Sequence, residues 1–189
     1  QKSFMKNDTT WLSDDSWWSF GSLPSSLPPG LYRIECDFMD EEQVALAWTL
    51  GCYNFDRFKK VSLSPQADSS QHSKDKGPMF AKLVVSNAVT LSKVATQTKS
   101  VYLARDLINI PAENMGPEAV EKAVQALASE FRGSRVSVVR GKELLDQNYP
   151  QIHAVGRAVA QMKHREPRLI SLEWNMDDAS LPLVVIVGK

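Results

Sequence analysis

The chain has 189 residues, of which 43% are hydrophobic and 23% charged, a composition typical of a globular protein. Its 22 basic residues balance 22 acidic residues, so its charge gives no support for a nucleic-acid or anionic-membrane partner. The two cysteines form neither a disulfide framework nor a zinc-binding pattern, and no apolar run approaches the roughly 20 residues that span a bilayer. We therefore expect reduced thiols in a cytosolic or organellar protein, with the cytoplasm preferred.

The first 78 residues mix short helix and strand patterns. Near the start, three tryptophans are expected to pack on a neighbouring domain or at an interface: Trp11, Trp17 and Trp18. Residues 31–38 alternate apolar and polar side chains and predict a half-buried strand. Asp40 is expected to cap a helix that Gly51 weakens or ends. Residues 64–78 lack periodicity and predict a loop or linker.

Residues 79–109 carry the longest helical pattern. Apolar or small side chains recur every three or four positions, at Val84, Ala88, Leu91, Ala95, Thr98 and Tyr102. At about 1.5 Å per residue such a helix reaches roughly 45 Å, which predicts a connector between two lobes. Pro111 cannot continue it, and Pro117 suits the first turn of a new helix. On local chemistry alone, an ordinary helix–loop–helix joint is the preferred interpretation of residues 105–118.

Helix and strand patterns alternate in the remaining residues. A helix is expected from Pro117 to about Phe131, and short strands at residues 135–140, 152–155 and 168–174. Residues 183–187 form a continuous apolar run, typical of a strand covered on both faces. The alternation predicts an α/β layer with a largely parallel or mixed sheet. Lys189 would end the last strand, where ligands sit in open α/β sheets; the alternative is a solvated terminus.

Other residues that could carry chemistry are better explained by structure. The histidines lack zinc-site spacing and are expected to be solvated or structural: His72, His153 and His164. Asp177-Asp178 predicts a turn, and Gly141-Lys142 lacks the surroundings of a phosphate loop. The basic residues near Phe55 and Phe58 are expected to pack amphipathically rather than bind RNA or an acidic partner: Arg57, Lys59 and Lys60.

Four short stretches of the sequence contain distinctive motifs, and they follow one another in a defined order along the chain. They are LGCYNFDRFK at residues 50–59, RDLINIPAENMGPE at 105–118, VGR at 155–157 followed by PRLI at 167–170, and VVIVGK at 184–189. Together they resemble the leucyl aminopeptidase family, the M17 metallopeptidases, over roughly residues 45–189. The resemblance implies an α/β protein with an N-terminal α/β lobe (1–78), a connecting helix (79–109) and the first part of an α/β catalytic domain with a mixed sheet (110–189).

The resemblance also implies a chemistry. Members remove an N-terminal amino acid, often leucine, from peptides with water activated by two divalent ions, zinc with manganese or magnesium variants. They are typically cytoplasmic homohexamers, and the tryptophan-rich start and the long helix are expected interface elements. The family's lysine ligand carries over to Lys189, which must be a neutral amine to bind metal. No catalytic residue carries over.

The family's other metal ligands would follow Lys189. Since one lysine cannot hold two ions, we expect the chain to be part of a longer polypeptide and to be inactive alone; its start at Gln1 rather than Met agrees with this. The alternative is a non-catalytic structural or binding relative with the same fold. An N-terminal lobe acting alone as a small-ligand module has no glycine-rich phosphate loop to support it.

Overall fold

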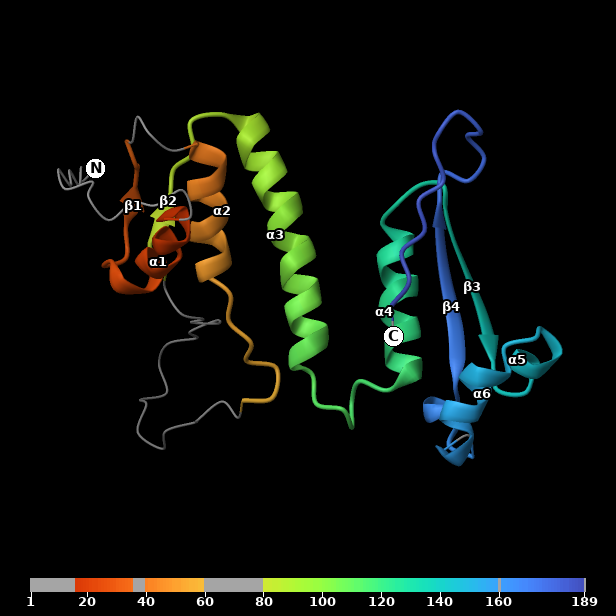
Figure 1. Cartoon of the computed structure of the whole chain (residues 1–189). Coiled ribbons are helices and arrows are strands. Elements are labelled where there is room, and N and C mark those ends of the chain that lie inside the picture. The colour runs from red at the N-terminus through yellow and green to blue at the C-terminus, as the bar shows by residue number, and fades with distance from the viewer. Residues whose placement is uncertain (1–15, 36–39, 60–79, 160, 189) are drawn as a thin grey trace, which may run out of the picture. The chain divides into compact units, whose positions relative to one another are not determined.

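The computed structural model describes residues 16–35, 40–59, 80–159 and 161–188 (Figure 1). They belong to two compact units, Gln1–Asn109 and Ile110–Lys189. Each unit combines helices with a two-stranded sheet, parallel in the first and antiparallel in the second, which confirms the predicted α/β class. Among the helices described, none is both long and apolar enough to cross a membrane.

The first unit is built around α2 (Glu41–Gly51), which lies between α3 (Ala88–Asn109) on one side and a group of shorter elements on the other (Figure 1). Those elements are η1 (Ser16–Ser22), α1 (Leu23–Ser26) and the parallel pair of β1 (Leu31–Tyr32) and β2 (Lys82–Leu83). Asp40 caps α2 as predicted, because its carboxylate accepts from the Glu42 N–H at 3.1 Å. Of the predicted strand at 31–38, β1 covers two residues, and residues 36–39 lie outside the described part.

The core of this unit lies along α2. Trp48 is only 2% exposed, and its Nε1 donates to the Ala81 carbonyl at 3.3 Å; the residues buried with it are Val44, Ala45, Ala47, Leu50, Ala81 and Val94. Trp17 and Trp18 stack with their ring centroids 3.8 Å apart, but Trp18 remains 54% exposed. Trp18 is therefore not buried within the described part of this unit, so burial at an interface stays a prediction; Trp11 lies outside the described residues.

The long helix differs from the prediction at its start and in the N-terminal part of the face that packs. It begins at Ala88 rather than at residue 79, because the backbone of β2 pairs with β1 and the Asn87 carboxamide accepts from the Thr90 N–H at 2.8 Å. Leu91, on the predicted face, is 57% exposed, whereas Val94 is buried. The C-terminal part of the predicted face does pack on α2: the Thr98 and Thr49 hydroxyls lie 2.7 Å apart, and the Tyr102 hydroxyl donates to the Thr49 carbonyl.

Gly51 marks a close approach of two backbones. A Cβ at this position would lie 1.8 Å from the carbonyl oxygen of Gly21, at the end of η1. We expect Gly51→Ala to lower the free energy of unfolding by about 1–3 kcal/mol, since η1 must move away from α2. Urea denaturation measures this. Gly30→Ala is the control, because its Cβ would make an ordinary contact of 3.4 Å with the Tyr32 ring; equal midpoints for the two variants would contradict the prediction.

The second unit contains an antiparallel pair of strands and several short helices. β3 (Ser134–Arg140) and β4 (Arg168–Trp174) pair along their whole lengths, from Ser134 opposite Trp174 to Arg140 opposite Arg168, which confirms both predicted strands. The remaining elements are α4 (Pro117–Ser129), α5 (Glu143–Asp146), α6 (Pro150–Gly156), η2 (Arg157–Val159) and η3 (Lys163–Arg165).

Two predicted strands of this unit are absent from the described structure. Residues 152–155 belong to α6, because Pro150 suits the first turn of a helix. Residues 183–187 form neither a helix nor a paired strand (Figure 1). They are 71–91% exposed. A strand requires a neighbour for its backbone hydrogen bonds, and among the described residues β4 pairs only with β3. The prediction of a covered strand was therefore wrong for this structure.

Candidate functional site

Lys189, the metal ligand implied by the resemblance, lies outside the described residues. The segment before it is open: nothing lies within 4 Å of the position that a Cβ on Gly188 would take. In the part of the chain that the structure describes, no three His, Cys, Asp or Glu side chains form a group that could hold a metal ion. The described side chains therefore do not make a two-metal centre among themselves.

The other candidate residues take up structural positions. His153 is half-buried on α6, His164 is exposed in η3, and His72 lies outside the described residues. Asp178 forms the predicted turn: it accepts from the Ser180 N–H at 3.0 Å and from the Ser180 hydroxyl at 2.6 Å, and these bonds lower the pKa of its carboxyl. Asp177 pairs with Arg135.

Gly141 and the basic residues near Phe55 and Phe58 also contribute to packing. The Gly141 N–H donates to the Pro167 carbonyl at 2.9 Å and is therefore engaged within the unit. The Arg57 guanidinium lies 5.7 Å from the centroid of the Phe58 ring, which agrees with amphipathic packing. Lys60 lies outside the described residues.

The stretches at 50–59 and 105–118 meet at the C-terminal ends of α2 and α3. Here five side chains form what we call the α2–α3 clasp: Tyr53, Tyr102, Arg105, Asp106 and Asn109. Tyr102 donates to the Thr49 carbonyl, and Arg105 donates to the Leu50 carbonyl at 2.9 Å. These carbonyls belong to the last turn of α2, where helix carbonyls lack partners within the helix and a cation is favourable.

The Tyr53 hydroxyl lies at the centre of the clasp. It donates to Asp106 Oδ1 at 2.8 Å and accepts from Asn109 Nδ2 at 3.0 Å. The Arg105 guanidinium lies over the Tyr53 ring at 5.2 Å, and the Tyr102 ring meets it edge-on with centroids 5.1 Å apart. Burial raises the pKa of Tyr53, and the bond to Asp106 raises it further, so the hydroxyl stays protonated at neutral pH.

Cys52, beside the clasp, is not activated as a nucleophile. Burial raises the pKa of its thiol, which disfavours the thiolate that reactive cysteines need. Where the two stretches meet, the described residues of the first unit form a network of paired hydrogen-bonding groups. They do not form a nucleophile with an adjacent base.

The third stretch also forms an internal contact. A Cβ on Gly156 would lie 2.4 Å from the Pro167 Cβ, so the VGR and PRLI segments touch where only glycine fits. The neighbouring Arg168 enters what we call the Glu121 cluster, which consists of Glu121, Arg140 and Arg168. The Glu121 carboxylate binds both guanidiniums, with Arg140 Nε at 3.1 Å from Oε2.

The Glu121 cluster is the most deeply placed charge group of the described second unit. Glu121 is 6% exposed, and the side chain of Arg168 is 4% exposed. The hydrogen bond from Arg140 does most to lower the pKa of Glu121, and Arg168 adds to this against the opposing effect of burial. Arg168 also donates to the backbone carbonyls of Lys163 and Glu166. The cluster therefore joins α4, β3 and β4, and both guanidiniums are paired with the Glu121 carboxylate.

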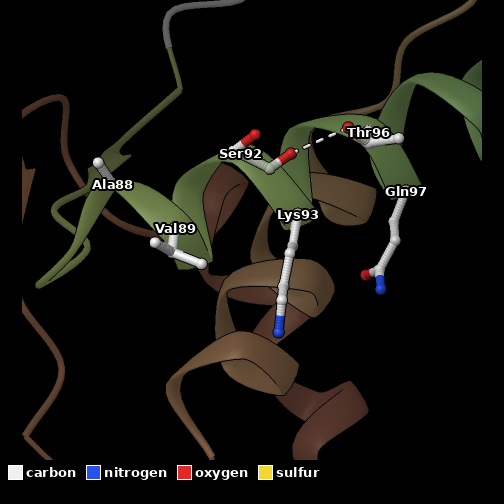
Figure 2. Close-up of a pocket in the computed structure, with 6 residues that line it drawn as sticks. All are labelled: Ala88, Val89, Ser92, Lys93, Thr96 and Gln97. Atoms are coloured by element: carbon white, nitrogen blue, oxygen red, sulfur yellow. Dashed lines mark hydrogen bonds between the residues drawn. The ribbon is translucent and has the colours of Figure 1, made fainter.

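One face of α3 carries a shallow hollow lined by Ala88, Val89, Ser92, Lys93, Thr96 and Gln97 (Figure 2). Its polar groups are engaged: the Thr96 hydroxyl donates to the Ser92 carbonyl at 3.0 Å, and Lys93 Nζ lies 3.3 Å from the Glu42 carboxylate of α2. No carboxylate or imidazole of the described residues lines the hollow to activate the Ser92 or Thr96 hydroxyl, so the hollow does not provide a catalytic centre.

Comparisons with known proteins place these segments in one family. Residues 102–189 match the catalytic domain of the cytosol aminopeptidase family (M17), and residues 10–68 match the N-terminal domain of M17 aminopeptidases. Peptidase B of Cronobacter sakazakii is 39% identical over 95 residues, which is 48% of this chain and 21% of that protein. A probable cytosol aminopeptidase of Chelativorans sp. is 28% identical over 194 residues, covering 94% of this chain and 36% of the relative.

Solved structures agree. The cytosol aminopeptidase of Coxiella burnetii is 34% identical with a TM-score of 0.71, covering 93% of this chain and 33% of its own. The bottromycin maturation enzyme BotP, in complex with Mn, shares the fold with a TM-score of 0.58 at 21% identity, covering 82% of this chain and 33% of its own. The chain thus spans about a third or less of the length of these proteins. Two M17 models matching successive parts of the chain, together with these relatives, show that it belongs to the M17 cytosol aminopeptidase family.

Proposed function

We propose that the protein is a metal-dependent aminopeptidase that removes N-terminal residues, with a leucine-type preference, from peptide substrates. This chain contributes the N-terminal lobe (1–78), the connecting segment (79–109) and the first part of the catalytic domain (110–189). The observation that carries the proposal is the match of residues 102–189 to the M17 catalytic domain, preceded in the chain by the match of residues 10–68 to the family's N-terminal domain.

The proposed cofactor is a pair of divalent ions, zinc or manganese with magnesium as a further candidate. The described residues do not fit such a pair by themselves, because they contain no cluster of metal ligands. We propose that Lys189 supplies one ligand as a neutral amine and that residues outside these 189 supply the others. When bound, the ions would activate a water and hold the substrate's amino terminus. We further propose a cytoplasmic homohexamer.

The proposal predicts that the isolated 189-residue chain hydrolyses nothing. Purified chain, supplied with Mn²⁺ or Zn²⁺ and a leucine amide with a fluorescent leaving group, should give no turnover above the metal-only blank. A longer protein that contains this chain should show turnover that a chelator abolishes, and Lys189→Ala should reduce it by at least about 100-fold, since even residues behind the first ligands cost 10- to 100-fold.

Each result bears on a separate part of the proposal. Chelator-sensitive turnover by the isolated chain would overturn the placement of the remaining ligands outside it. Full activity of the longer protein with Lys189→Ala would overturn the ligand role of Lys189. A longer protein with no metal-dependent turnover would favour the non-catalytic relative.

A further inference from the structure

The last turn of α3 is fastened to a residue that lies more than fifty positions earlier in the chain. Asp106 and Asn109 share that turn, and both bind the Tyr53 hydroxyl, which follows α2. Ile108, on the same turn, is 80% exposed, whereas Ile110, the first residue after the helix, is buried. Helix ends fray because their terminal carbonyls lack partners, and Pro111 prevents the helix from continuing.

We propose that the α2–α3 clasp is a conformational latch, in which Tyr53 decides whether α3 ends at Asn109 or about one turn earlier. With the latch closed, the segment leading to the second unit starts after Asn109. With the latch open, the last turn unwinds and adds roughly four residues to that tether. The latch would thus set the length of the tether between the two units.

The geometry gives Tyr53 this role rather than a general packing role. A phenol hydroxyl can donate once, and here the donor binds Asp106 while the oxygen accepts from Asn109, so both of its bonds go to one helical turn. Arg105 and Tyr102 hold the ring from its face and its edge, and each also binds a carbonyl at the end of α2. The Tyr53 ring is therefore held by two α3 side chains that also bind the end of α2, and its hydroxyl binds the last turn of α3.

The latch is tested by hydrogen exchange of backbone amides in Tyr53→Phe, which removes the hydroxyl and keeps the ring. We expect amides of residues 106–109 to exchange about fivefold to tenfold faster than in the wild type, corresponding to the loss of one or two ordinary hydrogen bonds. Amides in the first half of α3 and in α2 should be unchanged. Tyr32→Phe is the matched control, because it removes a hydroxyl that binds the Pro28 carbonyl at 2.8 Å in the same unit.

A second variant separates the latch from loss of stability. Asp106→Ala should accelerate the same amides, and the double variant Tyr53→Phe/Asp106→Ala should add little to Tyr53→Phe alone, because the bond between Tyr53 and Asp106 is already lost in that single variant. Unchanged exchange at residues 106–109 in Tyr53→Phe would overturn the proposal. So would uniform acceleration throughout α2 and α3, equal acceleration in Tyr32→Phe, or independent effects of the two substitutions.

Discussion

Replacing Glu121 by alanine is expected to lower the free energy of unfolding of the second unit by about 3–5 kcal/mol. The substitution leaves the Arg168 guanidinium, 4% exposed, without its carboxylate and removes a partner of Arg140. Removing one member of a buried ion pair costs this much because the remaining charge stays buried without compensation. Whole domains are stable by only about 5–15 kcal/mol, so the unit should approach unfolding at room temperature. Urea denaturation and hydrogen exchange of the β3 and β4 amides measure the effect.

The same helix provides the control. Glu118 pairs with Lys122 at 2.7 Å, four residues apart on the surface of α4. Exposed pairs of this kind contribute about 0.3–0.5 kcal/mol, so Glu118→Ala should barely move the transition. Similar shifts for the two variants would mean that Glu121 acts as a surface charge.

The pH dependence of stability gives a second measurement on Glu121. Because Arg140 and Arg168 lower the pKa of Glu121 in the folded chain, the carboxylate stabilises the fold above the ordinary value of 4.5, and this contribution is lost as pH falls through the lower folded-state value. The difference in urea midpoint between the wild type and Glu121→Gln should therefore shrink between pH 6 and the acid limit. A difference that stays constant with pH would argue against the charged pairing.

The elements that were predicted correctly are those that are determined by residues close to one another in the sequence. Asp40 caps α2, and the alternating apolar residues of β3 and β4 form strands that stop within a residue of the expected limits. The strand expected at residues 152–155 was wrong for a local reason, because a helix begins at Pro150. The other errors occurred where a partner distant in sequence decides the structure. Pairing of β2 with β1 delays the start of α3, and residues 183–187 lack a partner strand among the described residues.

The candidate site could be predicted only as a resemblance. The residues that carry it contact one another in the structure: Tyr53 binds Asp106, and Gly156 fits against Pro167. Contacts between segments far apart in sequence leave no periodic pattern. The stretches could therefore be recognised by their resemblance to family motifs, but the contacts that they make could not be predicted. Glu121 was missed, although it lies seven residues before the buried Ala128, a spacing that places both on one helix face.

The second large effect is expected at Trp48, whose replacement by alanine should destabilise the first unit by about 3–5 kcal/mol. The indole is 2% exposed, and its Nε1 hydrogen bond to the Ala81 carbonyl joins α2 to the residue before β2. Its loss leaves both a cavity and an unpaired carbonyl. Urea denaturation followed by far-UV circular dichroism should show an earlier transition for this unit.

Two further variants separate the cavity from the hydrogen bond. Trp48→Phe retains much of the ring volume but not the indole N–H, so it should cost about 1–3 kcal/mol for the unpaired Ala81 carbonyl. Trp18→Ala removes an indole that is already 54% exposed and should cost less than Trp48→Ala. Equal losses for Trp18→Ala and Trp48→Ala would show that the N-terminal stack, rather than the α2 core, holds the unit together. If Trp48→Phe matched Trp48→Ala, the bond between α2 and the start of β2 would outweigh apolar packing.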